Sequence, residues 1–215
     1  MGRRPYDHSV FINCPFDIPY KRIFDAIVFA VYDCGFLPRS ALEAETQKIA
    51  MRLERIVEVI DNCRYGIHDL SRASIDKKTR LARFNMPLEL GIFVGALLLG
   101  NNKQRTKTFV LLDREPHRYQ KFISDLNGID PKPHYNRVDD AIRIVRDWLR
   151  DVSGANYRIP TGGVIAARYH NFRKDLPYLA RELNQEVMEL TYPDYCCLIE
   201  DWLKENTAHG SLVDK

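Results

Sequence analysis

Short apolar runs alternate with longer amphipathic stretches over the first 150 residues of the chain. The short runs are rich in β-branched and aromatic residues and predict strands at 9–13, 36–42, 65–69 and 108–113, with a weaker one near 134–135. Apolar residues at helical spacing predict helices at 20–34, 46–62, 86–99, 119–126 and 139–149. Short apolar strands joined by helices are typical of a parallel, doubly wound sheet. We therefore predict an α/β fold with five strands and helices on both faces.

The pattern changes after residue 151. Residues 153–163 (SGANYRIPTGG) have the composition of a linker. Two or three further helices are predicted, at 164–173, 177–190 and 192–203. We expect an α/β domain over 1–152, a linker over 153–163 and a helical C-terminal region over 164–215.

Ligands of doubly wound sheets bind beyond the carboxyl ends of the strands, near the point where the strand order reverses. Residues 13–17, 43–45, 69–71 and 113–115 all follow predicted strands. The segment after the first strand supplies four candidates for residues that line a ligand site: Asn13, Phe16, Asp17 and Tyr20. Phe16 or Tyr20 is suited to stack on a base, and the alternative is that these aromatic rings belong to the core.

Two acidic residues give this edge a possible chemistry. Asp69 ends the third predicted strand, and Glu89 falls in the first turn of an apolar helix twenty residues later. Cleavage of an N-glycosidic bond builds positive charge on the anomeric carbon of the sugar, and a carboxylate can stabilise or attack that carbon. The alternatives are structural. Glu89 near Pro87 suits a helix start, and Asp69 with Ser71 suits the capping of a loop.

Basic residues crowd the connection between the two acids: Arg72, Lys77, Lys78, Arg80 and Arg83. They are suited to hold phosphate groups, or they form a solvated loop. The first strand is not followed by a Gly-x-Gly-x-x-Gly fingerprint, and a Walker-type Gly-Lys-Ser/Thr is missing from the chain. These absences argue against ATP hydrolysis and nicotinamide redox chemistry.

Composition narrows the remaining classes of function. The net charge of +3 is too small to indicate direct nucleic-acid binding, although the basic excess lies within residues 1–150 and favours an anionic ligand there. The five cysteines form no Cys-x-x-Cys pair, and the six histidines do not lie near them at ligand spacing, so we expect reduced thiols, no metal and a cytoplasmic protein. The longest apolar run, 88–99, contains Glu89 and is too short to span a membrane.

Three segments resemble, in order, blocks of a known superfamily: 10–17 (VFINCPFD), 66–71 (GIHDLS) and 85–91 (NMPLELG). The superfamily comprises nucleoside deoxyribosyltransferase-like proteins and the related bacterial Toll/interleukin-1-receptor-like (TIR-like) proteins. The resemblance covers roughly residues 9–150. It implies a flavodoxin-like sheet, with Glu89 as the catalytic carboxylate and Asp69 as a ligand-contacting residue.

The resemblance also implies a function. It predicts binding of a nucleoside, nucleotide or NAD and cleavage or transfer of its N-glycosidic bond, often within antiviral defence. Sites in the superfamily are commonly completed by a neighbouring subunit, so we expect a homo-oligomer. Ser71, Arg83 and Asn85 join the candidate ligand-binding residues.

Two positions depart from the pattern of the superfamily. Leu88 stands where an aromatic residue is common, and Arg83 stands where an Asn or Asp is common. Arg83 is suited to contact a phosphate, which favours nucleotides over nucleosides. The same departures also fit a sensor or assembly module that binds a nucleotide without cleaving it.

Overall fold

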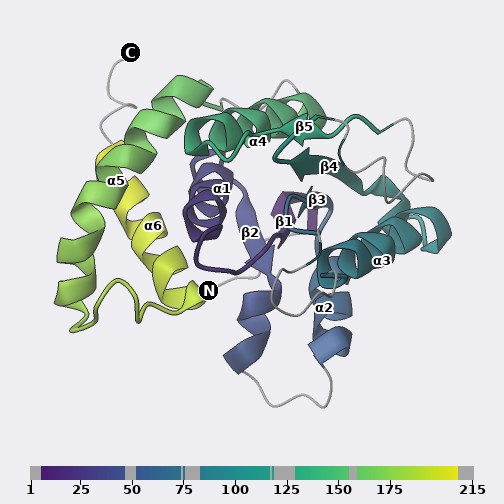
Figure 1. Ribbon diagram of the computed structural model, residues 1–215, viewed down its shortest axis with the longest axis horizontal. Coiled ribbons are helices and arrows are strands. Elements are labelled where there is room, and N and C mark those ends of the chain that lie inside the picture. Colours follow the sequence, from purple (N-terminus) through teal and green to yellow (C-terminus); the bar gives the residue numbers. More distant parts are fainter. Residues whose placement is uncertain are drawn as a thin grey trace.

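The computed structural model describes residues 6–46, 52–73, 75, 83–116, 118, 129–154 and 159–207. A parallel sheet runs through its centre (Figure 1). The five strands, in chain order, are β1 (Ser9–Asn13), β2 (Leu37–Ser40), β3 (Tyr65–Asp69), β4 (Thr108–Asp113) and β5 (Lys132–Pro133). Their order across the sheet is β2-β1-β3-β4-β5, which is the flavodoxin-like order. The predicted α/β class with a five-stranded parallel sheet is therefore confirmed.

Helices cover both faces of the sheet. Helices α1 (Lys21–Asp33) and α4 (Val138–Ser153) lie on one side, and α2 (Arg52–Asp61) and α3 (Asn85–Leu99) lie on the other (Figure 1). Three short 3-10 turns complete the first part of the chain: η1 (Tyr6–His8), η2 (Ala41–Thr46) and η3 (Gln104–Thr106). Among the helices that the structure describes, none has both the length and the continuous apolar character needed to cross a membrane.

Alternation along the strands creates a separate core on each face. Val10 and Ile12 of β1 pack with α1 and α4, whereas Phe11 points to the α2 and α3 side. In β3, Tyr65 and Ile67 belong to the first core. His68 faces α3 instead, with its ring 5.0 Å from that of Phe93.

The C-terminal helices pack against α1, on the side away from the sheet (Figure 1). They are α5 (Gly162–Glu182) and α6 (Tyr192–Thr207). Phe29 of α1 contacts Phe172 of α5 at 5.4 Å and Trp202 of α6 at 6.0 Å between ring centroids. Arg168 of α5 also pairs with Asp33 of α1 at 2.8 Å. The C-terminal helices and the α1 face of the sheet therefore share one hydrophobic core.

Some element boundaries differ from the prediction. The helices expected at 164–173 and 177–190 form one helix, α5, which continues through Pro177 and ends at Glu182. The weak fifth strand lies at 132–133, two residues before its expected position. Helix α3 begins at Asn85, so Glu89 starts the second helical turn and not the first. The helix expected at 119–126 and the first part of that expected at 46–62 lie outside the described residues.

Candidate functional site

The strand order reverses between β1 and β3, so the loops that follow these strands border the crevice where such folds bind ligands. Asn13 ends β1 and is 1% exposed. Its amide nitrogen donates to the backbone oxygen of Met86 at 2.8 Å and lies 3.0 Å from Nδ1 of His68. Asn13 thereby ties the end of β1 to β3 and to the first turn of α3.

Asp69 ends β3 and has no exposed surface. Its carboxylate accepts hydrogen bonds from the Tyr20 hydroxyl at 2.5 Å and from the Ser71 backbone nitrogen at 2.7 Å. Nε2 of His134 lies 2.9 Å from Oδ2 of Asp69. Burial acts to raise the pKa of Asp69, but His134, Ser71 and Tyr20 outweigh it and hold that pKa below its ordinary value. Asp69 is therefore an ionised, buried carboxylate whose partners surround it.

His134 is a member of this cluster that the sequence did not reveal. Its Nδ1 accepts a hydrogen bond from the Asn136 backbone nitrogen at 3.0 Å. That bond leaves the proton of a neutral ring on Nε2, which faces Asp69. The signal available in the sequence was its position directly after the fifth strand, and that strand has only two residues.

Glu89 is also buried, with 6% of its surface exposed. Burial raises its pKa to about 7, and the positive charge of Arg52 opposes this rise. Within the described part of the chain, the Glu89 carboxyl forms no hydrogen bond or ion pair. An ionisable group that is buried without a partner is costly, and such groups concentrate at functional sites.

The two carboxyl groups come from different layers. Asp69 follows the alternation of Tyr65 and Ile67 towards α1 and α4, whereas Glu89 is carried by α3 on the opposite side of the sheet. Both approach Cys14 closely enough to raise the pKa of its thiol, after burial, which is the main cause of that rise. The structure therefore brings both acids to the end of β1, but they do not contact each other directly. A direct contact between Asp69 and a ribose stays a prediction.

The histidine and cysteine at this edge act as packing residues. Burial lowers the pKa of His68 to about 3, so its imidazole is neutral. The buried Cys14 thiol is protonated, because burial raises its pKa well above the ordinary value. A protonated thiol is a poor nucleophile, so Cys14 is suited to packing and not to catalysis.

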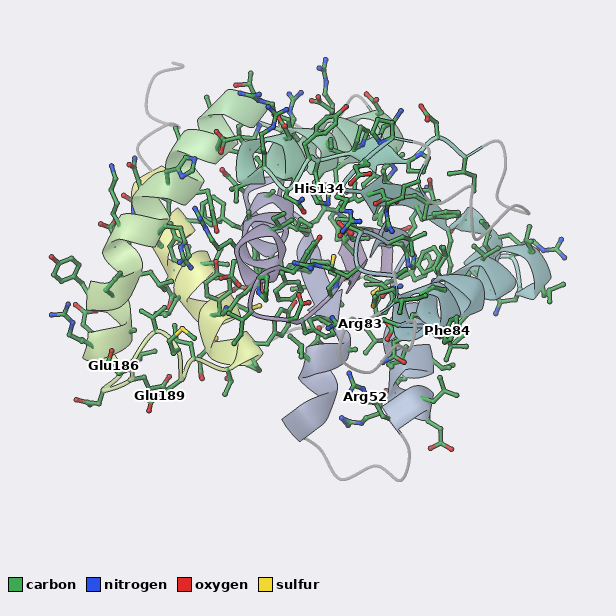
Figure 2. All side chains as sticks on the ribbon, viewed as in Figure 1. Arg52, Arg83, Phe84, His134, Glu186 and Glu189 are labelled. Carbon is green, nitrogen blue, oxygen red and sulfur yellow. The ribbon has the colours of Figure 1, made fainter. Side chains whose placement is uncertain are left out.

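The rim of the site is basic and aromatic. Asp17 pairs with Arg83 at 2.9 Å and lies 3.9 Å from Arg72. Phe84 is 72% exposed and stands next to Arg83 just before α3, and Arg52 begins α2 (Figure 2). Phe16 is 39% exposed and packs edge-on against Phe24 of α1.

The structure thus unites part of the predicted set. Tyr20, Asp69 and Ser71 form one buried cluster, and Asp17 pairs with Arg83. Asn85 is exposed at the first position of α3. Lys77, Lys78 and Arg80 lie outside the described residues. Among the residues that are described, no group of three or more His, Cys, Asp or Glu side chains is arranged to hold a metal ion.

Comparisons of the chain with protein-family models, with curated proteins and with solved structures gave no match.

Proposed function

We propose that this protein binds a nucleotide at the carboxyl edge of its sheet and cleaves the N-glycosidic bond of that nucleotide, with NAD as the leading substrate. The observation that supports the proposal is Glu89, a buried carboxyl group with a pKa of about 7 that forms no hydrogen bond or ion pair among the described residues. It lies in the second turn of α3, behind a rim that carries Arg83 and the exposed ring of Phe84.

Cleavage of this bond requires one carboxylate from the protein. When the bond from the ribose to a pyridinium breaks, its electron pair stays with the nicotinamide, which leaves as a neutral molecule. No general acid is needed, and ionised Glu89 stabilises the positive charge that develops on the sugar. A water molecule or an acceptor hydroxyl then attacks the anomeric carbon and loses its proton to solvent.

The remaining residues bind the nucleotide or position other side chains. Phe84 offers an exposed aromatic face for a base, and Arg83 offers a guanidinium for a phosphate. Asp69 is a positioning residue in this proposal, because it fixes Tyr20 and His134 and has no surface of its own to offer a ligand.

The first test is substitution of Glu89. We expect Glu89→Gln to reduce nicotinamide release from NAD by at least about 100-fold, because removing one electrostatic stabiliser of a transition state costs about 10²–10³ in rate. In the unaltered protein, release should rise with pH through about 7 as Glu89 ionises. Product is measured by chromatography, and circular dichroism checks the fold.

Glu58→Gln is the matched control, because Glu58 is an exposed glutamate on the neighbouring helix α2. Nicotinamide release should be unchanged in that variant. Full activity of Glu89→Gln would remove the basis of the proposal.

A second candidate function is nucleotide binding without turnover, as in a sensor or assembly module. The closed environment of Asp69 favours it, since Tyr20, Ser71 and His134 already surround the carboxylate that would orient the ribose during cleavage. Incubation with NAD and with mixed nucleotides separates the two functions: a ligand that is retained with no released base supports the sensor. A homo-oligomer that completes the site remains part of both proposals, so the incubation is repeated over a range of protein concentrations.

A further inference from the structure

A cavity of about 490 Å³ opens at the carboxyl edge of the sheet, on the side of α1 and α4. Neither Glu89 nor Asp69 lines it. Its lining comes from the start of α1, the loops after β3 and β4, and the turn before α4: Pro19, Arg22, Ile23, Arg72, Arg114, Asn136, Arg137 and Val138. The cavity therefore lies at the strand ends. Asp17 connects it to the rim, since its carboxylate is close to Arg72 of the lining and to Arg83.

Four arginines from four separate segments converge on this cavity, and none of the described residues that line it is acidic. Three of them have an acidic neighbour outside the lining. Arg72 is 3.9 Å from Asp17, Arg114 is 3.2 Å from Glu115, and Arg137 pairs with Asp140. The fourth, Arg22, forms no ion pair within the described residues. Nε of Arg114 is buried, and the Glu115 oxygen 3.2 Å from it is not aligned to accept a hydrogen bond.

The backbone around the arginines is held in place. Tyr135 and Asn136 both adopt the left-handed conformation, with φ of 52° and 56°. His134 fixes this turn, since its Nδ1 accepts from the Asn136 backbone nitrogen and its carbonyl oxygen accepts from the Arg137 nitrogen at 2.8 Å. The turn sets Asn136 and Arg137 at the cavity, and the buried ring of His134 anchors it to Asp69.

Two helices begin at the cavity. Arg22 and Ile23 are in the first turn of α1, and Val138 is the first residue of α4. The N-terminal end of a helix carries partial positive charge and favours anions. The helix N-termini and the guanidinium groups therefore both favour an anion in the cavity.

From this arrangement we infer that the cavity binds a compound with a diphosphate group, such as a nucleoside diphosphate. Planar guanidinium groups bind phosphate oxygens in pairs, and four of them can hold two adjacent phosphate groups. Asn136 adds an amide that is able to bond a sugar hydroxyl or a base edge. The volume is within the range of small-molecule sites, about 300–1,000 Å³. The inference rests on these residues alone and not on cleavage at Glu89.

The test is titration calorimetry with inorganic pyrophosphate, ADP and AMP as probes. We expect pyrophosphate and ADP to bind more tightly than AMP. Arg22→Ala and Arg137→Ala should each weaken pyrophosphate binding by about 10-fold or more, as is typical for loss of a charge-assisted hydrogen bond. Arg150→Ala is the matched control, because Arg150 is exposed at the far end of α4, and its affinity should equal that of the unaltered protein.

Arg22 and Arg137 are exposed, so thermal melting should show the same stability for all three variants. The inference is overturned if pyrophosphate does not bind at millimolar concentration, if AMP binds as tightly as ADP, or if the cavity variants bind like the control. Tighter binding of ADP than of pyrophosphate supports it and extends recognition to the nucleoside. Glu89→Gln should bind pyrophosphate as the unaltered protein does. If the unaltered protein binds pyrophosphate but releases no base from NAD, that result contradicts the proposed cleavage and leaves this inference standing.

Discussion

The two buried carboxyl groups near the strand ends, Asp69 and Glu89, differ in the direction of their pKa shifts. Asp69 is surrounded by Tyr20, Ser71 and His134, and its pKa stays below the ordinary value. Glu89 is enclosed without such partners among the described residues, and its pKa rises to about 7. Two carboxyl groups near the same thiol thus differ in protonation at neutral pH. The sequence showed both acids, but it gave no indication of which one had partners.

The raised pKa of Glu89 has a consequence for stability. The folded protein holds the Glu89 proton up to about pH 7, whereas the unfolded chain releases it near 4.5. The folded state therefore binds more protons between these values, and stability falls as pH rises through that window. The loss is at most about 3.5 kcal/mol, from about 1.4 kcal/mol for each unit of pKa.

Glu89→Gln should remove this loss. We expect urea unfolding to show that the variant gains stability relative to the unaltered protein between pH 5 and pH 8. Glu58→Gln, with its exposed carboxyl, should follow the unaltered protein at both values. Parallel behaviour of Glu89→Gln and the unaltered protein across this range would mean that Glu89 is solvated.

The candidate residues could be predicted where they follow a clear strand. Asn13 and Asp69 end runs of five buried residues, so their place at the edge of the sheet was predictable. His134, Arg22 and Arg137 were not identified as site residues. His134 follows a two-residue strand, Arg22 lies in the first turn of a helix, and Arg137 follows two residues with left-handed backbone. None of these places leaves a periodic pattern.

At the scale of elements, hydrophobic periodicity predicted the strands and helices whose apolar residues are buried in the core. β1, β3 and β4 were placed correctly because their apolar residues are buried on both faces. Helix α5 was divided wrongly at Pro177. Its buried residues on both sides of the proline, among them Phe172 and Leu176 before it and Ala180 after it, hold the helix together through tertiary packing, which local propensity does not include.

The contact between β3 and α3 depends on a glycine. A Cβ at Gly66 would lie 2.7 Å from Nε2 of His68 and 2.8 Å from Cζ of Phe93. We expect Gly66→Ala to destabilise the protein by about 1–3 kcal/mol, because two buried rings must move. Chemical denaturation measures the change.

Gly95→Ala provides the comparison, since a Cβ at Gly95 in α3 meets nothing within 4 Å. Alanine is favoured over glycine in a helix by about 0.5–1 kcal/mol, so this variant should be more stable than the unaltered protein. Equal stability of the two variants would contradict the close packing of β3 on α3.

At the scale of the whole molecule, the C-terminal helices are joined to the sheet domain through α1. Phe29, Phe172 and Trp202 form a continuous aromatic contact from α1 to α5 and α6. Ion pairs from Arg168 and Arg173 to Asp33 and Asp25 reinforce it. The change of composition after residue 151 predicted a separate helical region, but it did not show that this region completes the core on one face of the sheet.

Phe172→Ala should therefore destabilise the α1 face as well as α5. We expect a loss of about 3–5 kcal/mol, the usual cost of removing a fully buried phenylalanine. Tyr178→Ala, on the same helix but 65% exposed, should change stability by less than about 0.5 kcal/mol. Hydrogen exchange would show whether α1 opens together with α5 in the first variant, and protection of α1 that is unchanged would argue for two independent units.

His134 connects the turn before α4, which lines the arginine cavity, to Asp69 at the end of β3, which does not line that cavity. The His134 ring is bonded on one nitrogen to the backbone that carries Arg137, and it rests with the other against Asp69. A ligand that shifts Arg137 should therefore also act on the tip of β3 and on the phenol of Tyr20. We expect binding in the arginine cavity to alter the surroundings of Asp69 at the switch point of the sheet.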